Sequence, residues 1–168
     1  PFGAAIFDDA GKVLGLSVNC VIPQSTSVAH AEMMAFMTAQ MRTRCHRLND
    51  RGSGITLATS AQPCCMCYGA SVWAGVDTLL IGARATDVMA LTEFDEGPLP
   101  ADWIGELERR GIAVRRDVRR YAACPVLPAV CYEVDDHSCR AHSLAAPVPR
   151  NRVPRPARSL PRRPSDGA

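Results

Sequence analysis

Three of the eight cysteines fall within four consecutive positions, and this crowding constrains the chain more than any other feature. They belong to the segment Pro63-Cys64-Cys65-Met66-Cys67. Adjacent cysteines cannot pair comfortably in a disulfide, but thiolates at this spacing can hold a metal ion. Cysteines spread evenly along the chain would instead suit a secreted disulfide framework. We therefore expect reduced thiols, a metal site in this segment and a cytoplasmic location.

The residues around this segment predict a strand, a polar loop and a helix that starts near Cys65 and stops before Gly75. Cys64 and Cys67 lie three positions apart in the first turn of that helix, so both sulfurs can reach one point. The partial positive charge at a helix N-terminus favours the thiolate form of both side chains. Pro63 suits the start of the helix because its missing N–H costs nothing there.

A second polar patch, His30-Ala31-Glu32, opens a predicted helix over residues 29–47. His30 offers a nitrogen, and with Cys64 and Cys67 it completes three ligands of the kind that Zn²⁺ prefers. Three protein ligands leave a fourth tetrahedral position for water, as in catalytic zinc sites. Glu32 lies about 200° around a regular helix from His30, so the two converge only if the helix N-terminus points at the site. In that geometry Glu32 is the catalytic acid–base beside the water and not a ligand.

Other interpretations of these residues stay open. Cys65 could replace Cys64, or close the site as a fourth ligand and make it structural. The C-x-x-C pair could also serve redox chemistry. The joint pattern H-x-E … P-C-x-x-C, with each half opening a helix, favours a zinc site that deaminates nucleobases.

Apolar periodicity and turn residues predict a layered α/β domain with a mixed sheet. A hairpin over residues 3–18 is followed by a loop over residues 19–28. The predicted strands after this loop cover residues 55–59, 78–81 and 112–114. The predicted helices cover residues 29–47, 65–74 and 85–91, and a last helix begins near Trp103 and is closed by Gly111.

These motifs resemble the cytidine/deoxycytidylate deaminase-like superfamily, most closely bacterial nucleoside deaminases, guanine deaminases and tRNA adenosine deaminases. The segments that carry the resemblance are PFGA at 1–4, HAEM at 30–33, PCCMCYGA at 63–70 and FDEG at 94–97. The resemblance implies a three-layer α/β/α sandwich with a central mixed β-sheet. It also implies Zn²⁺ as the cofactor and a homodimer.

The resemblance further implies substrate-binding residues. Asn19 lies eleven residues before His30 and matches the family's asparagine that hydrogen-bonds the base or sugar. The acidic residue that shuttles protons or grips the purine in guanine deaminases falls on Asp95 or Glu96, which follow Phe94. Without the resemblance, Asn19 would be a turn residue and Asp95 a helix cap.

Charge divides the chain into an acidic body and a basic tail. Residues 1–139 carry 12 Lys and Arg against 16 Asp and Glu, whereas residues 140–168 carry seven Arg, six Pro and one acid. We expect a deaminase domain over 1–118 that lacks the helix usually found before PFGA, and a disordered tail over 140–168. Residues 119–139 receive no assignment. No apolar run is long enough to cross a bilayer, so no membrane contact is expected.

The sequence therefore predicts zinc-dependent hydrolytic deamination of an aminopurine base or nucleoside, of guanine or adenine type, with release of ammonia. A mildly acidic body has little affinity for a phosphate backbone, which favours a small-molecule substrate over nucleic acid. The alternative of adenosine-to-inosine editing in tRNA would need a basic groove. An inactive zinc-binding module is a further alternative, and the presence of Glu32 argues against it.

Overall fold

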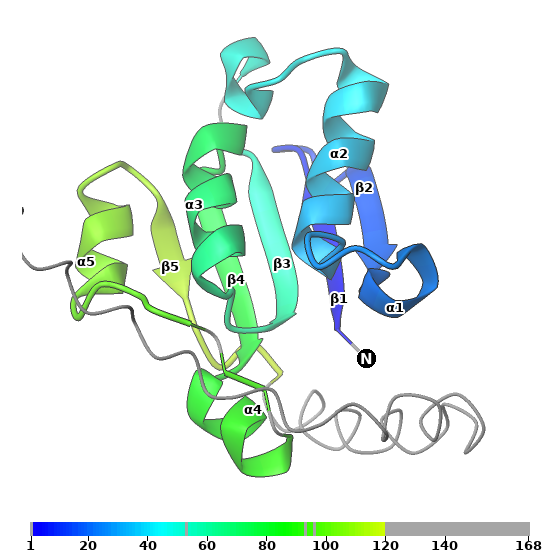
Figure 1. Ribbon diagram of the computed structural model, residues 1–168. Coiled ribbons are helices and arrows are strands. Elements are labelled where there is room, and N and C mark those ends of the chain that lie inside the picture. The colour runs from blue at the N-terminus through cyan, green and yellow to red at the C-terminus, as the bar shows by residue number, and fades with distance from the viewer. Residues whose placement is uncertain (1, 53, 93, 96, 120–168) are drawn as a thin grey trace, which may run out of the picture. The chain divides into compact units, whose positions relative to one another are not determined.

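The computed structural model describes residues 2–52, 54–92, 94–95 and 97–119 (Figure 1). The strands are β1 (Gly3–Phe7), β2 (Val13–Val18), β3 (Thr56–Ala61), β4 (Thr78–Ala83) and β5 (Ala113–Arg115). The helices are α1 (Val21–Gln24), α2 (Ala31–Thr43), the 3-10 turn η1 (Leu48–Arg51), α3 (Cys65–Ala74), α4 (Ala85–Leu91) and α5 (Trp103–Glu108). The strands form one sheet in the order β2-β1-β3-β4-β5. β1 is antiparallel to β2 and β3, and β3, β4 and β5 are parallel, so the predicted mixed α/β sheet is confirmed.

The predicted hairpin over residues 3–18 is confirmed as β1 and β2. Its turn is closed by Asp8, whose backbone N–H donates to the Lys12 carbonyl (3.1 Å) and whose carboxylate accepts from the Lys12 N–H (2.8 Å). Gly11 takes a φ of +76°, which glycine adopts without steric cost. The loop predicted after the hairpin contains the four-residue helix α1, which is too short to leave a periodic signal.

Several predicted boundaries differ from the observed ones. The helix expected over 29–47 covers Ala31–Thr43, because His30 is extended and Arg44 takes a left-handed conformation (φ +52°). β3 and β4 each run two residues beyond the predicted end, because parallel pairing continues to Ala61 opposite Ala83. Helices α3 and α4 have the predicted bounds.

Helix α2 packs closely on the sheet because small residues line the contact. A Cβ atom built on Gly15 of β2 would lie 2.5 Å from the Ala35 carbonyl oxygen and 3.2 Å from the Ala39 Cβ. The glycine and the two alanines therefore let the backbones of helix and strand approach each other. The core beneath α2 and α3 contains fully buried side chains from strands and helices, among them Ile6, Leu57, Leu79, Ile81 and Leu107.

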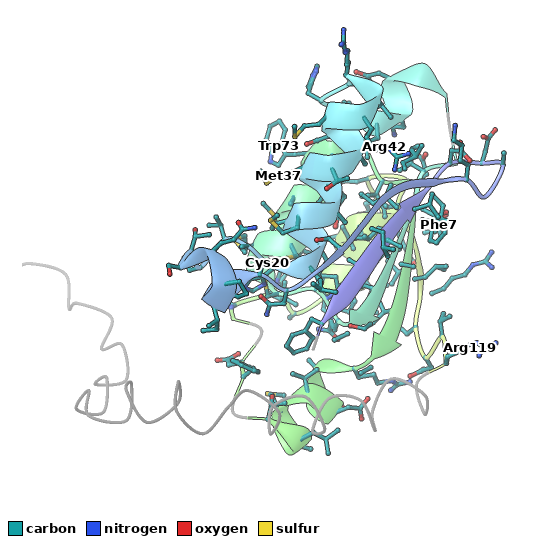
Figure 2. The ribbon with its side chains drawn as sticks, turned by 90° about the vertical axis from the view of Figure 1, so that its right-hand side faces the viewer. Phe7, Cys20, Met37, Arg42, Trp73 and Arg119 are labelled. Atoms are coloured by element: carbon teal, nitrogen blue, oxygen red, sulfur yellow. The ribbon has the colours of Figure 1, made fainter. Side chains whose placement is uncertain are left out.

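The two faces of the sheet differ. Figure 2 shows α2 on one side of the sheet and the side chain of Phe7 on the other. On that other side, strand residues line a groove of about 500 Å³. Leu16 and Val18 at its edge are 71% and 62% exposed.

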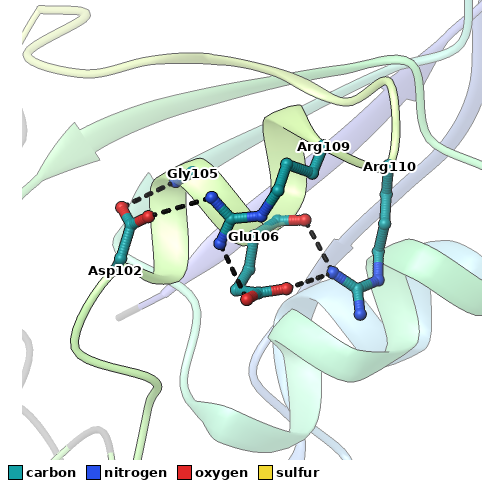
Figure 3. Close-up of polar contacts among 5 residues, drawn as sticks. All are labelled: Asp102, Gly105, Glu106, Arg109 and Arg110. Atoms are coloured by element: carbon teal, nitrogen blue, oxygen red, sulfur yellow. Dashed lines mark hydrogen bonds and ion pairs between the residues drawn. The ribbon is translucent and has the colours of Figure 1, made fainter.

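Charged side chains fix the ends of α5 (Figure 3). Asp102 caps the helix by accepting from the Gly105 N–H (3.1 Å), and Arg109 bridges Asp102 (3.2 Å) and Glu106 (2.7 Å). Arg110 also pairs with Glu106, and the hydrogen bonds from Arg110 and then Arg109 lower the pKa of this carboxyl. All of these groups lie at the surface, where ion pairs contribute little to stability, so their role is local.

Some predictions concern residues that the structure does not describe. Glu96, the tail over 140–168 and all but the first residue of the 119–139 segment lie outside the described residues. The five cysteines within the described part of the chain form no disulfide with one another. No helix in the described ranges is both long and apolar enough to cross a membrane.

Candidate metal centre and active site

Two helices begin side by side and present the predicted ligands at their starts. His30 is the N-cap residue of α2, and Cys64 is the N-cap residue of α3. Both have extended backbones, and neither side chain caps its own helix. His30 thus precedes the helix that carries Glu32, so the two side chains need not point about 200° apart, as they would within one regular helix.

The three predicted ligands converge. The Nδ1 atom of His30 lies 3.5 Å from the Cys64 sulfur and 3.7 Å from the Cys67 sulfur, and all three donor atoms lie within 4.8 Å of one another. Zinc distances of about 2.0 Å to nitrogen and 2.3 Å to sulfur place two tetrahedral ligand atoms about 3.5 Å apart. One nitrogen and two sulfurs at these separations fit a zinc ion. Among the described residues this cluster is the one that could hold a metal.

The two cysteines share their protons unequally. The hydrogen bond from the Cys67 thiol lowers the pKa of Cys64 to about 5, with further help from nearby His30. The same hydrogen bond, together with burial, raises the pKa of Cys67. Cys64 is therefore ready to bind as a thiolate, and Cys67 must release its proton when a metal binds.

Cys65 does not belong to the cluster. Its side chain is exposed, whereas Cys67 is fully buried and Cys64 is half-buried. A Cβ built on Gly97 would lie 3.0 Å from the Cys65 sulfur, so Cys65 faces the loop around Gly97. This placement favours Cys64 and Cys67 as the ligand pair over the alternatives that involve Cys65.

Glu32 is buried beside the cluster. It is 6% exposed, and burial raises its pKa above the ordinary value of 4.5. One carboxylate oxygen, Oε1, accepts from the Thr59 hydroxyl (2.9 Å). The other, Oε2, lies 3.4 Å from the Cys67 sulfur and so faces the metal site. A buried carboxyl with a raised pKa suits a group that takes up and releases protons.

A pocket of about 200 Å³ opens onto His30, Glu32 and Cys64. Asn19 and Asp95, which were predicted to bind substrate, both line this pocket. The Asn19 Oδ1 accepts from the Val21 N–H (3.0 Å), so its amide nitrogen remains to donate to a ligand. Asp95 also makes a local turn, in which its Oδ1 accepts from the Gly97 N–H (2.8 Å).

Sequence reasoning missed several residues around the site. Phe2 and Phe94 line the pocket and meet edge to face, with ring centroids 6.0 Å apart. Gln62 also lines the pocket, and its side-chain oxygen accepts from the Ala85 N–H at 3.4 Å. Gln62 directly precedes the cysteine segment, and that proximity was the available signal. Thr59 lies in β3, and no sequence motif indicates that it contacts the site.

The comparisons with known proteins agree with this site. The family model for the cytidine and deoxycytidylate deaminase zinc-binding region matches residues 1–83, which include the three ligand candidates and Glu32. The tRNA-specific adenosine deaminase of Buchnera aphidicola subsp. Schizaphis graminum is 29% identical over 128 residues, covering 76% of this chain and 77% of that protein. Matches to two other curated deaminases span 46% and 58% of their lengths.

Two solved structures are more similar still. Guanine deaminase from Nitrosomonas europaea is 44% identical, with a TM-score of 0.73, covering 77% of this chain and 71% of that chain. A related protein solved in complex with 2,6-diaminopurine is 43% identical, with a TM-score of 0.74, covering 80% of this chain and 73% of that chain. The chain therefore belongs to the cytidine and deoxycytidylate deaminase family.

Proposed function

We propose that this protein deaminates a free aminopurine base, guanine foremost, by hydrolysis. Water replaces the exocyclic amine, the ring carbon gains an oxo group, and ammonia leaves. The observation that carries the proposal is a buried carboxylate, Glu32, which lies beside the cluster of His30, Cys64 and Cys67 and lines a small pocket. The guanine deaminase from Nitrosomonas europaea and the complex with 2,6-diaminopurine support an aminopurine as substrate.

In this proposal His30, Cys64 and Cys67 hold the zinc. When bound, zinc acts as a Lewis acid and lowers the pKa of water. Glu32 does not bind the ion. It takes a proton from the attacking water through Oε2 and delivers protons to the ring nitrogen and to the departing amine. Its raised pKa brings the carboxyl closer to the operating pH, which favours transfer in both directions.

The pocket offers complementary groups for a purine. Asn19 presents an amide N–H to an acceptor on the base, because Val21 already occupies its oxygen. Asp95, or Glu96 beside it in sequence, would accept an N–H of the base or relay a proton. The rings of Phe2 and Phe94 provide apolar wall for a planar base.

Size and charge favour a free base over a tRNA. The pocket volume of about 200 Å³ is below the roughly 300–1,000 Å³ that is typical of sites for drug-sized ligands. Residues 1–139 carry more acidic than basic side chains, which weakens attraction to phosphates. The similarity to a tRNA-specific adenosine deaminase keeps tRNA editing as the second candidate function.

A substrate panel tests the proposal. The full-length, zinc-loaded protein would be assayed for ammonia release from guanine, 2,6-diaminopurine, adenine, adenosine, cytosine, cytidine and tRNA. We expect turnover on guanine and lower rates on the pyrimidines. Activity confined to adenosine in tRNA would establish the second candidate function instead. A zinc-loaded protein that releases ammonia from none of them would be an inactive zinc-binding module.

The predicted homodimer stays a prediction. The outer surfaces of α2 and α3 expose Met37, Met41 and Trp73, which are 52%, 76% and 81% exposed, and exposed apolar groups of this kind mark interfaces. In the view of Figure 2, Met37 and Trp73 lie on the same side of the molecule. Light scattering on the wild type and on Trp73→Ser would test whether this surface joins two copies. The predicted cytoplasmic location also stays a prediction.

A further inference from the structure

One buried hydroxyl contacts the carboxylate that moves protons in the proposed function. Thr59 lies in β3, and its hydroxyl donates to Glu32 Oε1 over 2.9 Å. Both side chains are buried, at 7% and 6% exposure, and 27 residues separate them in sequence. Alternate residues of β3 face the interior, and the neighbours of Thr59 in that row, Leu57 and Ala61, are apolar. A hydroxyl in such a row must be hydrogen-bonded, and its partner here is Glu32.

The two carboxylate oxygens of Glu32 have different neighbours. The Thr59 hydroxyl donates to Oε1, and Oε2 lies within hydrogen-bonding distance (3.4 Å) of the Cys67 sulfur, so it faces the metal site. A carboxylate without this partner could rotate and present either oxygen, or turn away from the site.

We propose that Thr59 is a positioning residue that orients Glu32 so that Oε2 faces the metal site. This inference rests on the proposed function, in which Glu32 is the acid–base. Thr59 does not line the pocket, so it acts through Glu32 and does not touch the base. A β-branched side chain suits the role, because its χ1 angle is restricted and its methyl group packs in the strand's interior row.

Three substitutions separate the hydroxyl from the shape of the side chain. Thr59→Val keeps the branched shape and removes the donor, and Thr59→Ser keeps the donor and removes a methyl group. Thr56→Val makes the same change in the same strand, at a position on the opposite face of the sheet. Each variant would be compared with wild type for zinc content, thermal unfolding, kcat and KM on guanine.

We expect Thr59→Val to keep its zinc and its KM while kcat falls about ten- to a hundredfold, the range that corresponds to a hydrogen bond to a charged group. Thr59→Ser should restore most of kcat, and Thr56→Val should behave as wild type. An undiminished kcat in Thr59→Val, or an equal loss in Thr59→Ser, would overturn the assignment. If Thr59→Val does not fold, Thr59→Ala takes its place beside Thr59→Ser, because both shorten the side chain and one of them keeps the donor.

A structural readout distinguishes failure of this inference from failure of the proposed function. Crystal structures of zinc-loaded wild type and Thr59→Val would show the orientation of Glu32 directly. We expect Oε2 to face the metal site in wild type and the carboxylate to turn or take two orientations in the variant. An unchanged carboxylate would refute the role of Thr59 whatever the substrate proves to be. A wild type that is inactive on the whole panel would instead refute the proposed function.

Discussion

Replacing Glu32 by Gln separates the proton carrier from the metal ligands. Gln keeps the length of the side chain and an oxygen that can accept from the Thr59 hydroxyl, so the local packing survives. It cannot take up a proton. The cluster of His30, Cys64 and Cys67 does not include Glu32, so the variant should bind zinc as tightly as wild type.

The size of the expected loss follows from the surroundings of Glu32. General acid–base catalysis contributes roughly 10²–10⁴-fold, and Glu32 would serve several successive transfers in one turnover. Asp95 also lines the pocket, but it is exposed and its carboxylate already accepts from the Gly97 N–H. A substitute base is therefore poorly placed, and we expect kcat to fall by about 10³-fold or more, or about 4 kcal/mol in the barrier.

The assay is ammonia release at saturating guanine, with zinc measured on the same preparations. Glu108→Gln is the matched control, because it makes the same chemical change at an exposed position of α5. Zinc loss in Glu32→Gln would mean that Glu32 is a ligand. Retained zinc with near-normal turnover would mean that another acid carries the protons, and the assignment of Glu32 would be refuted.

The raised pKa of Glu32 predicts that the stability of the metal-free protein depends on pH, with Glu32→Gln as the reference. Because burial raises the folded-state pKa of Glu32, its ionised form destabilises the folded state. Its contribution to stability is fully present below the unfolded value of about 4.5 and is lost as pH rises through the higher folded value. Chelator-treated wild type should therefore lose unfolding free energy relative to Glu32→Gln as pH rises above 4.5. A constant difference across that window would contradict the raised pKa.

Three further predictions follow from the site and the core. A three-ligand site should bind roughly one equivalent of zinc, and Cys64→Ala or Cys67→Ala should abolish this binding. Cys65→Ser should keep the zinc, and loss of zinc in this variant alone would mean that Cys65 is a ligand. In metal-free protein, alkylation of Cys64 by iodoacetamide should stay fast down to about pH 5 and slow below it, because the pKa of Cys64 is lowered. Zinc should protect the thiolate from alkylation. A rate that already falls near pH 8 would contradict the lowered pKa. Gly15→Ala should lower the free energy of unfolding in urea by about 1–3 kcal/mol, because its Cβ would meet the α2 backbone. Gly69→Ala, in open space on α3, is the control and should be neutral or stabilising by up to about 1 kcal/mol. Equal effects of the two substitutions would show that Gly15 is not needed for the close packing of helix and strand.

The residue types and short spacings along the chain were enough to predict the cluster that could hold a metal, and several of the helices and strands. Cys64 and Cys67 lie within one helical turn, so their convergence is a local property that the sequence contains. The bounds of α3 follow from the loop before Cys65 and from Gly75, whose φ of +74° ends the helix. The mixed sheet likewise followed from the alternation of strand and helix patterns.

Contacts between distant segments needed the tertiary structure. His30 meets the cysteines because it stands just before α2 in an extended conformation, and the sequence had placed it inside a longer helix. The bond from Thr59 to Glu32 depends on which face of β3 lies beneath α2, and the pocket position of Gln62 depends on how the loop after β3 runs. The exposure of Cys65 favours Cys64 and Cys67 as the ligand pair, a choice that the spacing of the three cysteines left open. Strand order and register decide which side chains meet across a sheet, and these are properties of the whole assembled chain that no short stretch of sequence encodes.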